Sequence, residues 1–121
     1  MNRTFDNILT YRDLQQILAD NCVTIVKASA TWCGPCKKIA NYVDDLFSKT
    51  SSNVRMVHLD IDSGTDLANY LSIRKVPTFI SFVGEDKMDV YEGSQKKMVD
   101  SFFRKVEMRA KLLSNKLKNN I

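Results

Sequence analysis

The hydrophobic and polar positions of this chain change period several times, and each change predicts a new element of secondary structure. Continuous apolar runs with many β-branched residues cover 23–30 and 54–61, as in strands that are buried on both faces. A third such run covers 76–83, and a turn leads from it into a fourth strand over 87–92. The apolar side chain of Phe5 marks a candidate first strand.

Apolar residues at helical spacing predict helices between these strands. The first helix covers about 11–20, and Thr10 can cap its start. The second covers about 35–49. A short third helix follows the strand over 54–61, and Ser63 or Thr65 can cap it.

The last helix follows Gly93, and its apolar positions lie along one side: Met98, Phe102, Val106, Ala110, Leu113 and Leu117. Strands that alternate with helices and end in a hairpin predict an α/β fold, a central mixed β-sheet flanked by helices on both faces. The 121 residues, 44% of them hydrophobic, suffice for one core, and no linker or repeat divides them. We therefore expect a single domain over 1–121, in which 110–121 extends the C-terminal helix.

A pair of cysteines stands where the strand over 23–30 gives way to the helix over 35–49. Cys33 and Cys36 are three positions apart across the expected first helical turn, so they can close a small disulfide ring. Cys33 lies at the helix N-terminus, where unpaired backbone N–H groups and the positive end of the helix dipole favour a thiolate. Pro35 suits the first turn because its missing N–H would be unpaired there in any case. The sequence therefore predicts thiol–disulfide chemistry.

The segment Trp32-Cys33-Gly34-Pro35-Cys36-Lys37 resembles the active-site motif of the thioredoxin family. The resemblance covers about 9–109, because Ile73-Arg74-Lys75-Val76-Pro77-Thr78-Phe79 and then Gly93 follow in the family's order. It implies the thioredoxin fold and a thiol–disulfide oxidoreductase that reduces protein disulfides. No cofactor is required by that chemistry. The implied partners are disulfide-containing protein substrates and an upstream disulfide reductase similar to thioredoxin reductase.

The resemblance also implies a role for each residue of the site. Cys33 would be the nucleophile that forms a mixed disulfide with substrate, and Cys36 would resolve it, leaving a redox-active Cys33–Cys36 disulfide. Pro77 would follow a cis peptide bond and lie against the disulfide, where neighbouring backbone pairs with substrate; a proline that merely opens a strand is the alternative. The substrate-binding surface would comprise Trp32, Gly34, Pro35, Lys75, Val76, Pro77 and Gly93.

Two positions depart from the family pattern. Lys27 stands six positions before Cys33, where most thioredoxins have a buried Asp that is credited with helping the resolving cysteine lose its proton. An ammonium there would stabilise a thiolate, whereas burial would favour the neutral amine, which could accept the Cys36 proton. We therefore expect Lys27 to tune the pKa of the site. Asn41 replaces a proline that commonly kinks the active-site helix, so a straighter helix is expected.

The charge and the cysteine content of the chain indicate which compartment and which classes of partner to expect. Three cysteines, two of them in the motif, favour a reducing compartment, first the cytoplasm and alternatively an organelle. No stretch resembles a secretory leader or a membrane span, so no membrane partner is expected. The net charge of +4 comes mainly from the basic segment after Gln95. Without an aromatic platform this segment predicts a solvated helix face rather than nucleic-acid binding, and we expect a monomer.

Three rival interpretations follow from the same residues. A Cys-x-x-Cys pair can supply half of a tetrahedral zinc site, but the only further candidates are Cys22 and His58, so no metal is expected. We interpret Cys22 as a small apolar filler and His58 as a strand residue. A thioredoxin-like oxidant or isomerase is the redox alternative, since Lys27 changes the thiolate energies. A binding module that retains the fold without catalysis is the other.

Overall fold

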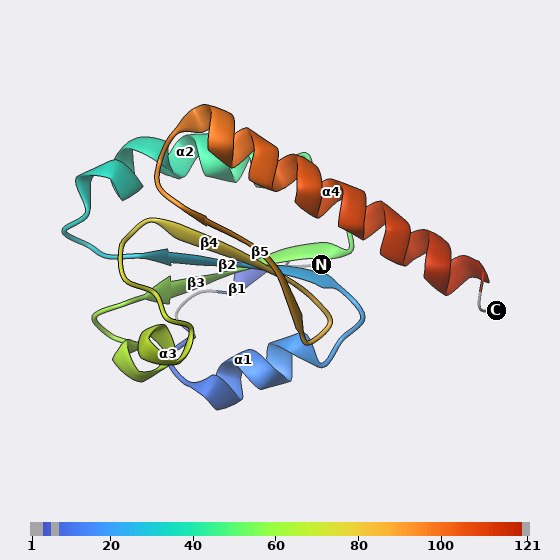
Figure 1. Ribbon diagram of the computed structural model, residues 1–121, viewed down its shortest axis with the longest axis horizontal. Coiled ribbons are helices and arrows are strands. Elements are labelled where there is room, and N and C mark those ends of the chain that lie inside the picture. The colour runs from blue at the N-terminus through green and yellow to red at the C-terminus, as the bar shows by residue number, and fades with distance from the viewer. Residues whose placement is uncertain (1–3, 6–7, 120–121) are drawn as a thin grey trace.

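The computed structural model describes residues 4–5 and 8–119, which contain a five-stranded sheet between two layers of helices (Figure 1). The strand order is β1-β3-β2-β4-β5. The strands β1, β3 and β2 run parallel, whereas β4 is antiparallel to β2 and β5 is antiparallel to β4. The predicted mixed sheet is therefore confirmed. The strand bounds are β1 Thr4–Phe5, β2 Val23–Ser29, β3 Val54–Asp60, β4 Thr78–Val83 and β5 Asp86–Glu92.

Within the described residues, helices cover both faces of the sheet (Figure 1). The helices α1 (Tyr11–Leu18) and α3 (Thr65–Tyr70) share a buried cluster with Val26 and Ile80 of the sheet. The helices α2 (Gly34–Ser48) and α4 (Lys96–Asn119) share the other cluster with Ile25 and Phe79. Successive side chains of a strand point to opposite faces, so Ile25 and Val26 serve one cluster each. This two-sided burial explains the apolar run of β2.

The two short helices begin with different local hydrogen bonds. The Thr10 hydroxyl accepts the Asp13 N–H at 3.1 Å, and the Asp13 carboxylate accepts the Thr10 N–H at 3.1 Å, so the predicted cap of α1 is confirmed. The predicted cap of α3 is wrong, because its N-cap is Gly64, which has no side chain to accept a bond. The hydroxyl of Thr65 instead donates to main-chain carbonyls of the preceding turn, and Asp60 accepts the N–H groups of that turn.

The long helix α4 differs from the predicted pattern at both ends. Its buried residues are Val99, Phe102, Phe103, Val106 and Ala110. Met98 is 46% exposed and Leu117 is 39% exposed, so the predicted apolar side is wrong at these two positions. The C-terminal part of α4 projects past the sheet, where no second layer covers it (Figure 1). Long as α4 is, it is too polar to cross a bilayer, and no other helix of the described residues is long and apolar enough to do so.

Candidate active site

The two motif cysteines form a disulfide at the N-terminus of α2. After β2 ends, the Cys33 N–H donates to the carbonyl oxygen of Ala30 at 3.1 Å, and Cys33 then serves as the N-cap of α2. The Cys33 sulfur accepts the backbone N–H of Cys36 at 3.2 Å. Because the first N–H groups of a helix have no partner within it, this geometry directs a donor and the helix dipole at the sulfur. The same arrangement favours a Cys33 thiolate once the disulfide is reduced.

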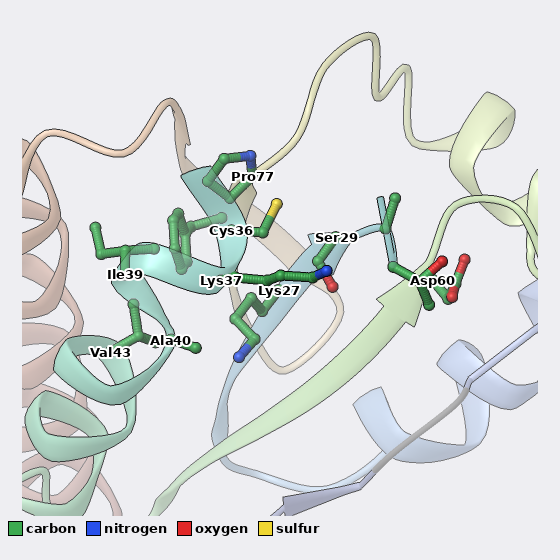
Figure 2. A pocket seen from close by; sticks show the side chains of 12 residues that line it. Lys27, Ser29, Cys36, Lys37, Ile39, Ala40, Val43, Asp60 and Pro77 are labelled. Carbon is green, nitrogen blue, oxygen red and sulfur yellow. The ribbon is translucent and has the colours of Figure 1, made fainter. Parts of the chain in front are cut away.

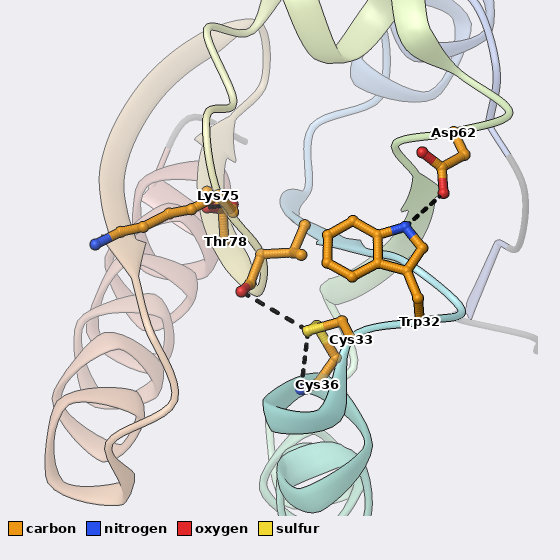
Figure 3. Close-up of a disulfide and its surroundings, with 7 residues drawn as sticks. Trp32, Cys33, Cys36, Asp62, Lys75 and Thr78 are labelled. Atoms are coloured by element: carbon orange, nitrogen blue, oxygen red, sulfur yellow. Dashed lines mark hydrogen bonds between the residues drawn. A yellow bond between two sulfur atoms is a disulfide. The ribbon is translucent and has the colours of Figure 1, made fainter.

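The loop between α3 and β4 lies against this disulfide (Figure 3). The peptide bond between Val76 and Pro77 is cis, as the resemblance implies. The carbonyl oxygen of Val76 lies 3.7 Å from the Cys33 sulfur. The Thr78 hydroxyl donates to the Lys75 carbonyl at 2.7 Å, and the Gly93 N–H donates to the Pro77 carbonyl at 3.0 Å. These bonds fasten the loop to the start of β4 and to the end of β5, so that main chain faces the reactive sulfur.

Trp32 presents a large apolar surface beside the disulfide. Its side chain is 65% exposed, and its indole N–H donates to the Asp62 carboxylate at 2.8 Å (Figure 3). Sequence reasoning missed Asp62. The available signal was the parallel pairing of β2 with β3, because the residues that follow two adjacent parallel strands meet at the same edge of the sheet. Asp62 therefore fixes the orientation of the indole ring.

A pocket of about 230 Å³ lies between Cys36, the first turns of α2 and the sheet (Figure 2). Lys27 on β2 and Asp60 at the end of β3 both line it. In Figure 2 the Lys27 side chain extends from β2 in the direction away from the Cys36 sulfur. The pocket thus brings together the half-buried Lys27, Cys36 and Asp60, a carboxylate that sequence reasoning assigned to a strand only.

The contacts of Tyr42 join α2 to the start of α4 beside the site. The Tyr42 hydroxyl donates to the Asp100 carboxylate, and this bond raises the pKa of Tyr42 above its ordinary value because the phenolate would repel the carboxylate. The ammonium of Lys96 lies 5.0 Å from the centre of the Tyr42 ring, within cation–π range. Lys96 is thereby held near the first turns of α2.

The remaining residues of chemical interest lie apart from the disulfide. Cys22 is half-buried just before β2 and carries a free thiol. His58 lies on β3 directly opposite Lys27 in the strand register. In the chain from 8 to 119 and at 4–5, no group of three or more His, Cys, Asp or Glu side chains is arranged to hold a metal ion. The α2 helix passes through Asn41 without interruption.

Comparisons with known proteins agree on one family. Residues 7–105 match the family model described as Thioredoxin. The chain is 35% identical to thioredoxin of Equus caballus over 79 residues, which are 65% of this chain and 74% of that protein. It is 32% identical to Thioredoxin-2 of Pyricularia oryzae over 91 residues, which are 75% of this chain and 53% of that protein. The match therefore spans about half the length of this fungal relative.

A solved structure of similar shape comes from Malassezia sympodialis, whose thioredoxin is described as Mala s 13, a member of a pan-allergen family. It superposes with a TM-score of 0.76 at 26% sequence identity, covering 88% of this chain and 96% of that one. The solution structure of oxidised thioredoxin from Plasmodium falciparum gives a TM-score of 0.73 at 24% identity, which bears on the fold alone. The predicted thioredoxin fold is confirmed.

Proposed function

The chain belongs to the thioredoxin family, and we propose that it reduces disulfide bonds in other proteins. Family membership and the Cys33–Cys36 pair support dithiol–disulfide exchange and protein-disulfide reductase activity. The observation that carries the proposal is the disulfide itself, which lies at a helix N-terminus and against the Val76–Pro77 main chain. The substrates, the recycling partner and the compartment belong to the proposal.

Reduction begins at Cys33. In the dithiol form, the Cys33 thiolate attacks one sulfur of the substrate disulfide, and a bond forms between them as the substrate's own S–S bond breaks. The second substrate sulfur leaves as a thiolate and takes a proton from solvent. The Cys36 N–H, 3.2 Å from the Cys33 sulfur, supports this step because it stabilises negative charge on the attacking atom.

Cys36 completes the reaction. It loses its proton, attacks the Cys33 sulfur of the mixed disulfide and displaces the remaining substrate thiolate. The Cα atoms of the two cysteines are 5.3 Å apart in the disulfide form, within the usual range for a disulfide. Two electrons have then passed to the substrate. An upstream reductase of the thioredoxin reductase type must return two electrons before the next cycle.

Substrate binds over the disulfide on a surface where small residues leave the main chain accessible and Trp32 supplies apolar contact. We assign this surface to Trp32, Gly34, Pro35, Lys75, Val76, Pro77 and Gly93. Val76 supports the assignment because its carbonyl oxygen already lies beside Cys33, where an extended substrate can pair with main chain. Gly34 has no side chain, and nothing lies within 4 Å of its Cβ position, so a substrate can approach the main chain there.

Lys27 tunes the site through the pocket that it shares with Cys36. Replacing Lys27 with Asp reverses the charge near the resolving thiol and should move the pH dependence of disulfide reduction to higher pH. Lys27→Met removes the charge and should move it less. Equal profiles for the three proteins would show that the Lys27 ammonium, which extends away from the Cys36 sulfur, does not act on it.

The activity is tested by reduction of insulin with dithiothreitol as electron donor. Wild type and Cys22→Ser, which keeps the reactive pair, should accelerate precipitation of the insulin chains, and Cys33→Ser should not. Equal inactivity of wild type and Cys33→Ser would overturn the enzymatic function and leave a binding module.

The direction of electron flow is tested by the reduction potential of the Cys33–Cys36 pair. A reduction potential of about −270 mV supports a reductase in a reducing compartment such as the cytoplasm. A reduction potential of about −180 mV would favour a disulfide isomerase, and one of about −120 mV would favour an oxidant.

A further inference from the structure

A second hollow opens beside the disulfide ring and is distinct from the pocket that contains Lys27. Its volume is about 310 Å³, and it is lined by Gly34, Pro35, Lys38, Ile39, Ser94 and Lys96. Gly34 and Pro35 lie between the two cysteines, so this hollow adjoins the main chain of the disulfide ring, although neither cysteine lines it. Its walls come from the first turns of α2 and from the segment that starts α4.

Two ammonium groups from different helices flank this hollow, and none of its lining residues is acidic. Lys38 lies one turn after Gly34 on the exposed side of α2. Lys96 is also exposed, and its contact with the Tyr42 ring keeps it close to α2. Among the residues that the structure describes, neither lysine pairs with a carboxylate within 4.0 Å. Their charges are therefore available to a ligand.

On the other sides of the disulfide, the charged side chains of Lys75 and Asp62 are paired or acidic. The ammonium of Lys75 lies 3.9 Å from the Glu92 carboxylate, which offsets its charge. The carboxylate of Asp62 lies beside Trp32. Lys37 of the motif is exposed as well but lines the other pocket, so the positive charges of this hollow are those of Lys38 and Lys96.

We propose that the Lys38–Lys96 hollow receives an acidic side chain of the substrate, so that the protein prefers disulfides flanked by Asp or Glu. The inference rests on the proposed function, because it requires substrates to bind over the disulfide. A carboxylate in the hollow attracts both ammonium groups, and their field also speeds the encounter with acidic segments. Pro35 and Ile39 supply apolar walls for the methylene groups of such a side chain.

The test uses three peptides that share one intramolecular disulfide and carry Glu, Gln or Lys at the positions flanking it. Stopped-flow fluorescence of Trp32, which adjoins the disulfide, follows oxidation of the reduced full-length protein by each peptide. Each rate constant is divided by the rate constant with dithiothreitol, which reports the intrinsic reactivity of the peptide disulfide. At low salt the normalised rates should fall in the order Glu, Gln, Lys. The Glu peptide should react about fivefold to twentyfold faster than the Lys peptide, and the ratio should shrink in about 0.5 M salt.

Two double variants test whether the preference for the Glu peptide arises from the charges at the hollow. The double variant Lys38→Gln/Lys96→Gln should lose most of the preference. Lys111→Gln/Lys116→Gln, which removes the same charge from exposed positions near the far end of α4, should keep it. Equal normalised rates for the three peptides, or an equal loss of preference in both double variants, would overturn the inference. Absence of reaction with every peptide would overturn the proposed function instead.

Discussion

Replacing Asp89 with Asn should destabilise the fold, because it breaks a half-buried ion pair between β5 and α4. The Nε of Arg109 donates to one carboxylate oxygen of Asp89 at 2.8 Å, and the Nη2 donates to the other at 3.4 Å. The Arg109 and Asp89 side chains are only 27% and 19% exposed. Water therefore screens this pair less than it screens an ordinary surface pair.

The size of the effect follows from this geometry. Exposed ion pairs contribute about 0–1 kcal/mol, whereas a hydrogen bond to a charged group contributes about 1.5–3 kcal/mol. For a two-point contact at this burial we expect Asp89→Asn to lower the free energy of unfolding by about 1–2 kcal/mol. The bond from the Asp89 N–H to the Ser81 hydroxyl uses main chain and survives the change. A double-mutant cycle with Arg109→Met should give a coupling energy of the same size.

The effect should also depend on pH. The Arg109 guanidinium lowers the pKa of Asp89, first through its hydrogen bond and further by charge attraction, against the opposing effect of burial. A carboxyl group whose folded-state pKa is lowered contributes stability above its unfolded-state pKa of about 3.9. That contribution is lost as the pH falls through the lower, folded-state pKa. The difference between wild type and Asp89→Asn should therefore be complete at neutral pH and shrink below about pH 4.

Urea unfolding followed by circular dichroism measures both quantities. The matched control is Asp45→Asn, which breaks the pair between Asp45 and Lys49, whose side chains are 61% and 70% exposed. This control should stay close to wild type at every pH. A coupling energy below about 0.5 kcal/mol, which is within the range of exposed pairs, would refute the reasoning. So would a stability difference that is the same at pH 7 and pH 3.

Three further predictions concern the site and the local structure that supports it. Cys36→Ser should accumulate a mixed disulfide with an oxidised substrate on non-reducing gels, because serine cannot resolve it; an equal adduct in Cys33→Ser would contradict the order of attack. Gly93→Ala should lower the free energy of unfolding by about 1–3 kcal/mol, since Gly93 has φ 144° and an added Cβ would stand 2.7 Å from the Tyr91 hydroxyl. Calorimetry measures this loss of stability, and adding Tyr91→Phe to the Gly93→Ala variant should partly restore it. An unchanged melting temperature in Gly93→Ala would contradict the prediction. Thr10→Ala should cost about 1 kcal/mol in urea unfolding through loss of the helix cap, whereas Thr10→Ser should not; equal stability of the two variants would argue against the cap.

The extended helix α4 shows where pattern reasoning stops. Helical spacing predicts its existence and places Phe102, Val106 and Ala110 on one side, because neighbours on a helix face are close in sequence. The exposure of Met98 and Leu117 depends on where the helix lies relative to α2 and to the edge of the sheet. The spacing of apolar residues along one helix carries no information about how that helix is placed against other elements.

The sequence by itself determined the chemistry of this protein, since Cys33 and Cys36 are three positions apart and meet within one turn once the helix forms. The tertiary structure decided what surrounds them. It brings Asp62 to Trp32, 30 residues away, because β2 and β3 are parallel neighbours, and it sets Lys96 beside Lys38 because α4 packs against α2. Contacts of this kind depend on strand order, register and helix packing, which arise only when distant segments bury their apolar faces together.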